Sequence, residues 1–182
     1  MQAQGLTAQG TVTIAGPRGL ESGTVTVAAW GPDHCRVAIT LGSPLLRRSY
    51  TAVMSGKSAV ISAPAGILRS VPLPVGPGLG CALLPSAVAA PSGTHGATLT
   101  SDASGRPASL RWSAHGRATE LSYSDYAASN GVQYAATLVE TVQGKAALTV
   151  HIETVSLATL SDADFLLPPP QKKIAQHAGG AQ

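Results

Sequence analysis

The dominant pattern along this chain is an alternation of apolar and polar residues with a period of two. In residues 35–41 the apolar positions are Cys35, Val37, Ile39 and Leu41, and small or polar residues lie between them. The same alternation recurs at residues 11–14, 24–27, 108–113, 121–124, 132–138 and 148–153. Because successive side chains of a strand point to opposite faces, this pattern predicts antiparallel strands with one packed and one solvated face.

Turn sequences separate these strands, at residues 16–23, 31–33, 42–44, 55–57, 104–107, 115–117, 129–131 and 143–145. Short connections of this kind join neighbouring strands, so we expect a meander. After Ile152 the apolar positions slip by one, to Val155 and Leu157. Such a slip is typical of a β-bulge, and we expect the last long strand to bend there.

The segment 71–93 breaks the alternation, because it is apolar but rich in proline and glycine. Pro85 limits any helix inside it to a turn or two, and we expect the segment to form a plug or lid. The predicted fold class is mainly β: a strongly curved antiparallel sheet, or incomplete β-barrel, with this short irregular or helical plug across its concave face. We expect one domain over 7–168, preceded by a tail (1–6) and followed by a disordered tail (169–182).

Composition narrows the class of protein. Of the 182 residues, 44% are hydrophobic and only 12% are charged, which argues against a disordered chain. Aromatic residues make up 4%, so we expect a core built from Val, Leu, Ile and Ala. Such a core can leave room for an apolar ligand. The net charge is +3, but the only adjacent basic pairs are Arg47-Arg48 and Lys172-Lys173. This scattered charge argues against a nucleic-acid partner, and no apolar run is long enough to span a bilayer.

Residues 33–35 place an acid, an imidazole and a thiol side by side. Adjacent strand residues point to opposite faces, so His34 and Cys35 cannot converge on one metal ion or one substrate. Cys35 is in phase with the apolar positions, and the Gly-Pro-Asp before it has a turn composition. We therefore interpret this stretch as the corner between two strands.

The other chemical motifs also have structural interpretations. The histidines lack zinc-binding spacing, and the glycine-rich residues 76–81 lack the strand and helix of a dinucleotide loop. Tyr123 and Tyr126 flank Asp125 at an expected strand end, and we favour aromatic caps on the core edge over a pocket rim. We therefore expect no catalytic residue, no metal, no cofactor and no enzymatic activity.

The packed face of the predicted sheet is the candidate ligand site. We expect it to present a hydrophobic lining formed by Val25, Val37, Ile39, Leu110, Trp112, Leu121, Tyr123, Tyr134, Leu138, Val150 and Ile152.

Two stretches of the sequence resemble a known family. Residues 105–168 run from GRPASLRW through YSDY to DADFLLP, and residues 23–39 read GTVTVAAWGPDHCRVAI. Both are similar to the LolA/LolB-like superfamily of outer-membrane lipoprotein-sorting proteins and their uncharacterised relatives. The close of the pattern is formed by Asp162, Asp164, Phe165 and Pro168. Members usually begin with a signal peptide and a helix that fills the concave face, and this sequence shows neither pattern at its start.

The resemblance implies a non-enzymatic protein of the periplasm or cell envelope that binds or carries a lipid, an acyl chain or another hydrophobic ligand. A cytoplasmic location is the alternative. The implied partners are lipid or an acylated protein, with peripheral membrane contact and no nucleic acid. The alternative function is a structural or protein-interaction β domain with a filled core and no ligand. Cys35 and Cys81 either pair in a disulfide, which would staple segment 71–93 to the sheet, or stay as two buried thiols.

Overall fold

The computed structural model describes residues 2–16, 19–31, 34–42, 47–55, 58–62, 95–114 and 116–166. Within these ranges the elements are β1 (Gln2–Gly16), β2 (Gly19–Trp30), β3 (His34–Leu41), β4 (Arg48–Ser55), β5 (Ser58–Ser62), β6 (His95–Ser101), β7 (Pro107–Ala114), β8 (Arg117–Ser129), β9 (Val132–Val142), β10 (Lys145–Ser161) and the 3-10 helix η2 (Asp162–Phe165).

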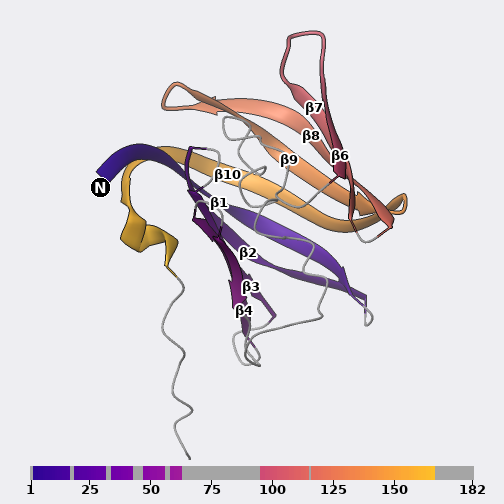
Figure 1. Cartoon of the computed structure of the whole chain (residues 1–182), viewed down its shortest axis with the longest axis horizontal. Coiled ribbons are helices and arrows are strands. Elements are labelled where there is room, and N and C mark those ends of the chain that lie inside the picture. The colour runs from indigo at the N-terminus through magenta and orange to yellow at the C-terminus, as the bar shows by residue number, and fades with distance from the viewer. Residues whose placement is uncertain are drawn as a thin grey trace, which may run out of the picture.

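The strands form one 10-stranded sheet in the order β5-β4-β3-β2-β1-β10-β9-β8-β7-β6. Every pairing along this order is antiparallel. The meander expected from the short turns holds within each half of the chain, and the last strand then returns to pair with the first. Figure 1 shows the sheet strongly bent and open. Among the described strands, β5 and β6 are the two ends of the strand order. The prediction of a curved, open antiparallel sheet is confirmed.

Two bulges bend β10. The pairing with β1 shifts from Gln9–Thr154 to Gly10–Ile152, so Glu153 is the extra residue. This confirms the bulge predicted from the slip in apolar phase. A Cβ on Gly10 would lie 1.9 Å from the His151 carbonyl oxygen, so only glycine fits at this close approach. The pairing with β9 shifts a second time between Ala146 and Leu148, which leaves Ala147 as the extra residue.

The main core covers one face of the sheet, which we call the apolar face. Its buried members extend over β1, β2, β3, β7, β8, β9 and β10: Ala8, Val12, Val25, Val27, Ala29, Cys35, Val37, Ile39, Leu41, Leu110, Leu121, Tyr123, Tyr134, Ala135, Leu138, Leu148, Val150, Ile152 and Val155. Pairing explains why they gather, because cross-strand partners share a face. Val25 lies opposite Ile39, and Val150 lies opposite Leu138.

A second, smaller core lies on the opposite face of β2, β4 and β10. Val53 and Ala28 both pair with Arg36, whereas Val37, one residue further along β3, belongs to the apolar face. Val53 packs with Leu160 and with Phe165 of η2 in this second core. The C-terminal helix therefore folds back onto the sheet and covers the face that the ligand-site prediction did not use.

Two expectations need correction, and two others lie outside the described residues. The tail expected at 1–6 is wrong, because β1 begins at Gln2 and pairs with the end of β10. The turn expected over 16–23 is also too long, since Gly16 pairs with Gly19 and β2 continues without a break. The expected plug (71–93) and C-terminal tail (169–182) lie outside the described residues.

Cys35 is disulfide-bonded, and the chain's other cysteine, Cys81, lies outside the described residues. We predict an intramolecular Cys35–Cys81 bond. Intact-mass measurement after alkylation without reductant should show no added groups, and two should appear after reduction. In Cys35→Ser the remaining thiol should react without reductant. A covalent dimer on a non-reducing gel would contradict the intramolecular pairing.

Candidate functional site

The residues predicted to line a ligand site do share the apolar face. All of them are buried except Trp112, which is half-buried and packs against the same core. Cross-strand pairs connect them on neighbouring strands, as in Leu110 with Leu121 and Tyr123 with Leu138. These aliphatic and aromatic side chains thus form one continuous buried cluster, and their contact with a ligand stays a prediction.

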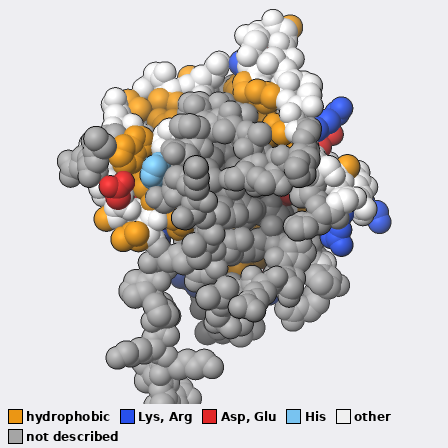
Figure 2. All heavy atoms as spheres, in the orientation of Figure 1, with side chains coloured by type: hydrophobic (Ala, Val, Ile, Leu, Met, Phe, Trp, Pro, Cys, Tyr) orange, Lys and Arg blue, Asp and Glu red, His pale blue; other side chains and the backbone are white. Residues whose placement is uncertain are grey.

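Apolar side chains also reach the surface near the limits of this face. Leu157 is 48% exposed and pairs with the half-buried Leu6, close to the end of β10. Leu99 on the edge strand β6 is 46% exposed and pairs with the buried Leu110. Figure 2 shows hydrophobic side chains at the surface among polar ones. An apolar ligand could therefore meet leucine side chains before it reaches the buried part of the face.

Glu140 is the exception to the apolar character of the face. It continues the alternation of Leu138 by one step on β9, and it pairs with Leu121 on β8 and with Leu148 on β10. The residue is only 4% exposed. Its Oε2 atom is buried and has no hydrogen-bond partner within the described part of the chain. The second bulge of β10, at Ala147, sits directly beside this position and sets the register that places Glu140 opposite Leu148.

Desolvation of this carboxyl raises the pKa of Glu140 to about 8. A carboxylate far from water is costly unless it is paired, so the group holds its proton instead. At neutral pH the Glu140 side chain is therefore mostly a neutral acid, which can both donate and accept a hydrogen bond.

The surroundings of Glu140 on this face are apolar or uncharged. From β8 the neighbours are Thr119, Leu121 and Tyr123, and from β10 they are Leu148 and Val150. Of the described residues in this group, Tyr123 is the only titratable one, and its burial raises the pKa of its phenol well above the usual value. No described cation faces Glu140 from these strands.

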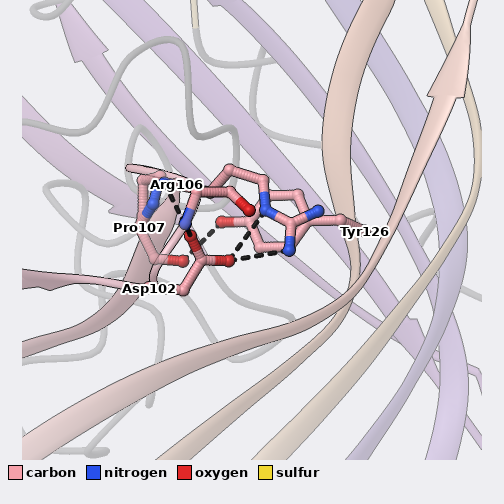
Figure 3. Close-up of polar contacts among 5 residues, drawn as sticks. Asp102, Arg106, Pro107 and Tyr126 are labelled. Atoms are coloured by element: carbon pink, nitrogen blue, oxygen red, sulfur yellow. Dashed lines mark hydrogen bonds and ion pairs between the residues drawn. The ribbon is translucent and has the colours of Figure 1, made fainter.

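A polar cluster lies away from this face, in the turn between β6 and β7. Figure 3 shows Asp102 accepting hydrogen bonds from the backbone N–H of Arg106 at 3.0 Å and from Arg106 Nε at 2.8 Å. The Arg106 guanidinium stacks 4.5 Å from the Tyr126 ring centroid, and the Tyr126 hydroxyl donates to the Pro107 carbonyl. These bonds, first that from the Arg106 backbone, lower the pKa of Asp102. All partners belong to the turn, to the start of β7 and to β8, so the cluster holds the turn rather than a substrate.

The cluster changes the interpretation of Tyr123 and Tyr126. They do not cap a strand end, because both lie within β8. Asp125 between them has a φ of 53° and is exposed, whereas Tyr123 is buried in the main core. This local departure from strand geometry lets Tyr126 turn its hydroxyl toward β7.

His34 and Cys35 point to opposite faces, as the alternation predicts. Cys35 belongs to the main core, whereas the His34 ring lies 5.3 Å from Trp30 and 5.6 Å from Phe165 by ring centroids. No group of three or more metal-ligating residues occurs among the described residues. Within the same ranges, no helix is long and apolar enough to cross a membrane.

Comparison with solved structures finds proteins of similar fold. An outer membrane lipoprotein-sorting protein domain from Vibrio parahaemolyticus superposes with a TM-score of 0.61 at 11% identity, over 88% of both chains. A LolA superfamily protein from Nitrosomonas europaea superposes with a TM-score of 0.55 at 15% identity, over 91% of this chain and 90% of that one. Neither a protein-family model nor a curated protein sequence matches the chain. The LolA-like fold expected from the sequence is therefore confirmed as a structural likeness.

Proposed function

We propose that this protein is a non-enzymatic carrier or binding protein for a lipid, an acyl chain or another hydrophobic ligand, acting in the periplasm or cell envelope. The observation that carries the proposal is the continuous apolar face from β3 to β7, including every predicted lining residue. Each buried methylene of a ligand would contribute about 0.8 kcal/mol of binding free energy. The likeness to two LolA superfamily structures supports the same assignment at the level of fold.

The two tryptophans provide a test, because one lies on each face. Trp112 packs against the main core, and Trp30 packs in the second core with Phe165. We predict that a long-chain alcohol carrying bromine, a contact quencher of indole fluorescence, quenches Trp112 in the Trp30→Phe variant. In Trp112→Phe, where only Trp30 remains, the same probe should leave the emission unchanged.

Native mass spectrometry with lipid extraction complements the quenching experiment, since a co-purifying lipid would identify the natural ligand class. Absence of saturable quenching in Trp30→Phe, with a clean ligand-free mass, would overturn the carrier proposal. The chain would then be better interpreted as a packed interaction domain. Equal quenching of both tryptophans would indicate nonspecific adsorption and would also contradict a ligand site on the apolar face.

A further inference from the structure

We propose that Glu140 is the polar anchor of the ligand site, and that it selects apolar ligands that carry a hydrogen-bond donor, most strongly a primary amine. This inference rests on the proposed function and deepens it. The apolar face would hold the hydrocarbon part, and the Glu140 carboxyl would receive the one polar group. The ligand class is therefore a long-chain amine or an amine-bearing lipid, not a free fatty acid.

The geometry points to this role because one carboxyl oxygen of Glu140 has no hydrogen-bond partner among the residues that the structure describes. This Oε2 atom is buried, and the whole residue is 4% exposed. The other charged side chains with short contacts, such as Glu120 with Arg111 and Asp102 with Arg106, are paired on strands or turns. A buried polar atom left unsatisfied costs about 1–3 kcal/mol, and that cost is removed when a ligand donor fills it.

The residues around Glu140 favour a ligand with a cationic hydrogen-bond donor over a ligand with an anionic acceptor. Glu140 pairs with Leu121 and Leu148, and the described neighbours on β8 and β10 carry no positive charge that a ligand carboxylate or phosphate could use. An ammonium brought into this setting would form a charge-assisted hydrogen bond with the ionised carboxyl, which is about twice as strong as a neutral one.

The proposal also predicts that Glu140 releases its proton when an amine binds, and this release can be measured. The raised pKa means that Glu140 is mostly protonated at pH 7 in the free protein. When an alkylammonium binds, the carboxyl must release its proton to the buffer to form the ion pair. We therefore expect calorimetry of amine binding in buffers of different ionisation enthalpy to report release of ~1 proton in the wild type.

The competing probes are an alkylamine and the methyl ether of the same chain length, each displacing the brominated alcohol from the Trp30→Phe protein. We expect the amine to displace it at about 10- to 100-fold lower concentration, since a hydrogen bond to a charged group is worth ~1.5–3 kcal/mol. The additional change Glu140→Gln should abolish this advantage and the proton release. The exposed Glu153→Gln on β10 is the matched control and should retain both.

The outcomes separate the two proposals. If the brominated alcohol binds but the amine and the ether displace it equally, or if Glu140→Gln leaves the amine advantage intact, the role of Glu140 is overturned and the carrier function stands. A fatty acid stronger than the amine would overturn it as well. If no apolar probe binds, the carrier function itself fails. Proton release is measured on protein with Glu140 intact, so a Glu140 variant that misfolds still leaves a decisive measurement.

Discussion

Replacing Glu140 with Gln should make the protein more stable than the wild type at pH 8, by about 3–5 kcal/mol, with little difference near pH 4. The carboxyl is buried among leucines, and its pKa rises from 4.5 to about 8 on folding. Each pKa unit corresponds to about 1.4 kcal/mol. Above pH 4.5 the unfolded chain gains free energy by ionising Glu140 while the folded protein keeps the proton, and the amide removes this difference because it cannot ionise.

The direction in which stability changes with pH follows from the number of protons bound by the folded and unfolded states. Between pH 4.5 and about 8 the folded protein holds the Glu140 proton and the unfolded chain has lost it, so the folded state binds more protons. The free energy of unfolding must then fall as the pH rises through this window and become level above it. The lowered pKa values of Asp102 and Asp164 act the other way, and their contributions are lost only as the pH falls below about 4.

Urea denaturation from pH 5 to pH 9 measures this effect as the difference between wild type and variant. Glu153→Gln makes the same chemical change at an exposed position on β10 and should leave the wild-type slope unchanged. Parallel pH profiles for the wild type and Glu140→Gln would show that Glu140 is ionised at little cost, contrary to its apolar setting.

Much of the sheet could be predicted from the sequence, because alternation reports directly on which side of a strand is buried. It correctly assigned the inward set Cys35, Val37, Ile39 and Leu41, all buried in the structure. The slip after Ile152 likewise predicted the bulge at Glu153. These features are local, since each depends only on the side chains of one strand.

Other features depend on distant pairing, and the local pattern does not contain them. Strands β4, β5 and β6 were not predicted, and β5 and β6 are edge strands. Strand β1 extends back to Gln2 because the end of β10 supplies its partner over Gln2–Ser161 and the following pairs. The return of β10 to β1 therefore both lengthens the first strand and decides the strand order.

Glu140 was missed although a signal was present. The apolar phase of β9 runs through Tyr134, Ala136 and Leu138, and the next residue in that phase is a carboxylic acid. A charged residue in an apolar phase usually marks the place where a strand leaves the core. Here β9 continues to Val142 and Glu140 stays buried, and this can be seen only once β8 and β10 are in place.

Replacing Phe165 with Ala should destabilise the protein by about 3–5 kcal/mol, the usual cost of removing a buried phenylalanine ring. Phe165 is 2% exposed and packs with Val53 and Leu160. Its ring centroid lies 6.4 Å from that of Trp30 and 5.6 Å from that of His34, so the substitution also removes two aromatic contacts. Urea denaturation in the Trp112→Phe background, monitored by Trp30 fluorescence, measures this loss of stability with a probe that lies beside Phe165.

The neighbouring Leu166→Ala is a matched control, because Leu166 is 64% exposed and its truncation should change stability by less than about 0.5 kcal/mol. Ser161 N and Oγ both donate to Asp164 Oδ2, so η2 keeps its own polar contacts in both variants. A loss below about 1 kcal/mol in Phe165→Ala would mean that η2 contributes little to the fold. The second core on β2, β4 and β10 would then be stable without its helical cover, and the apolar face alone would account for the stability of the sheet.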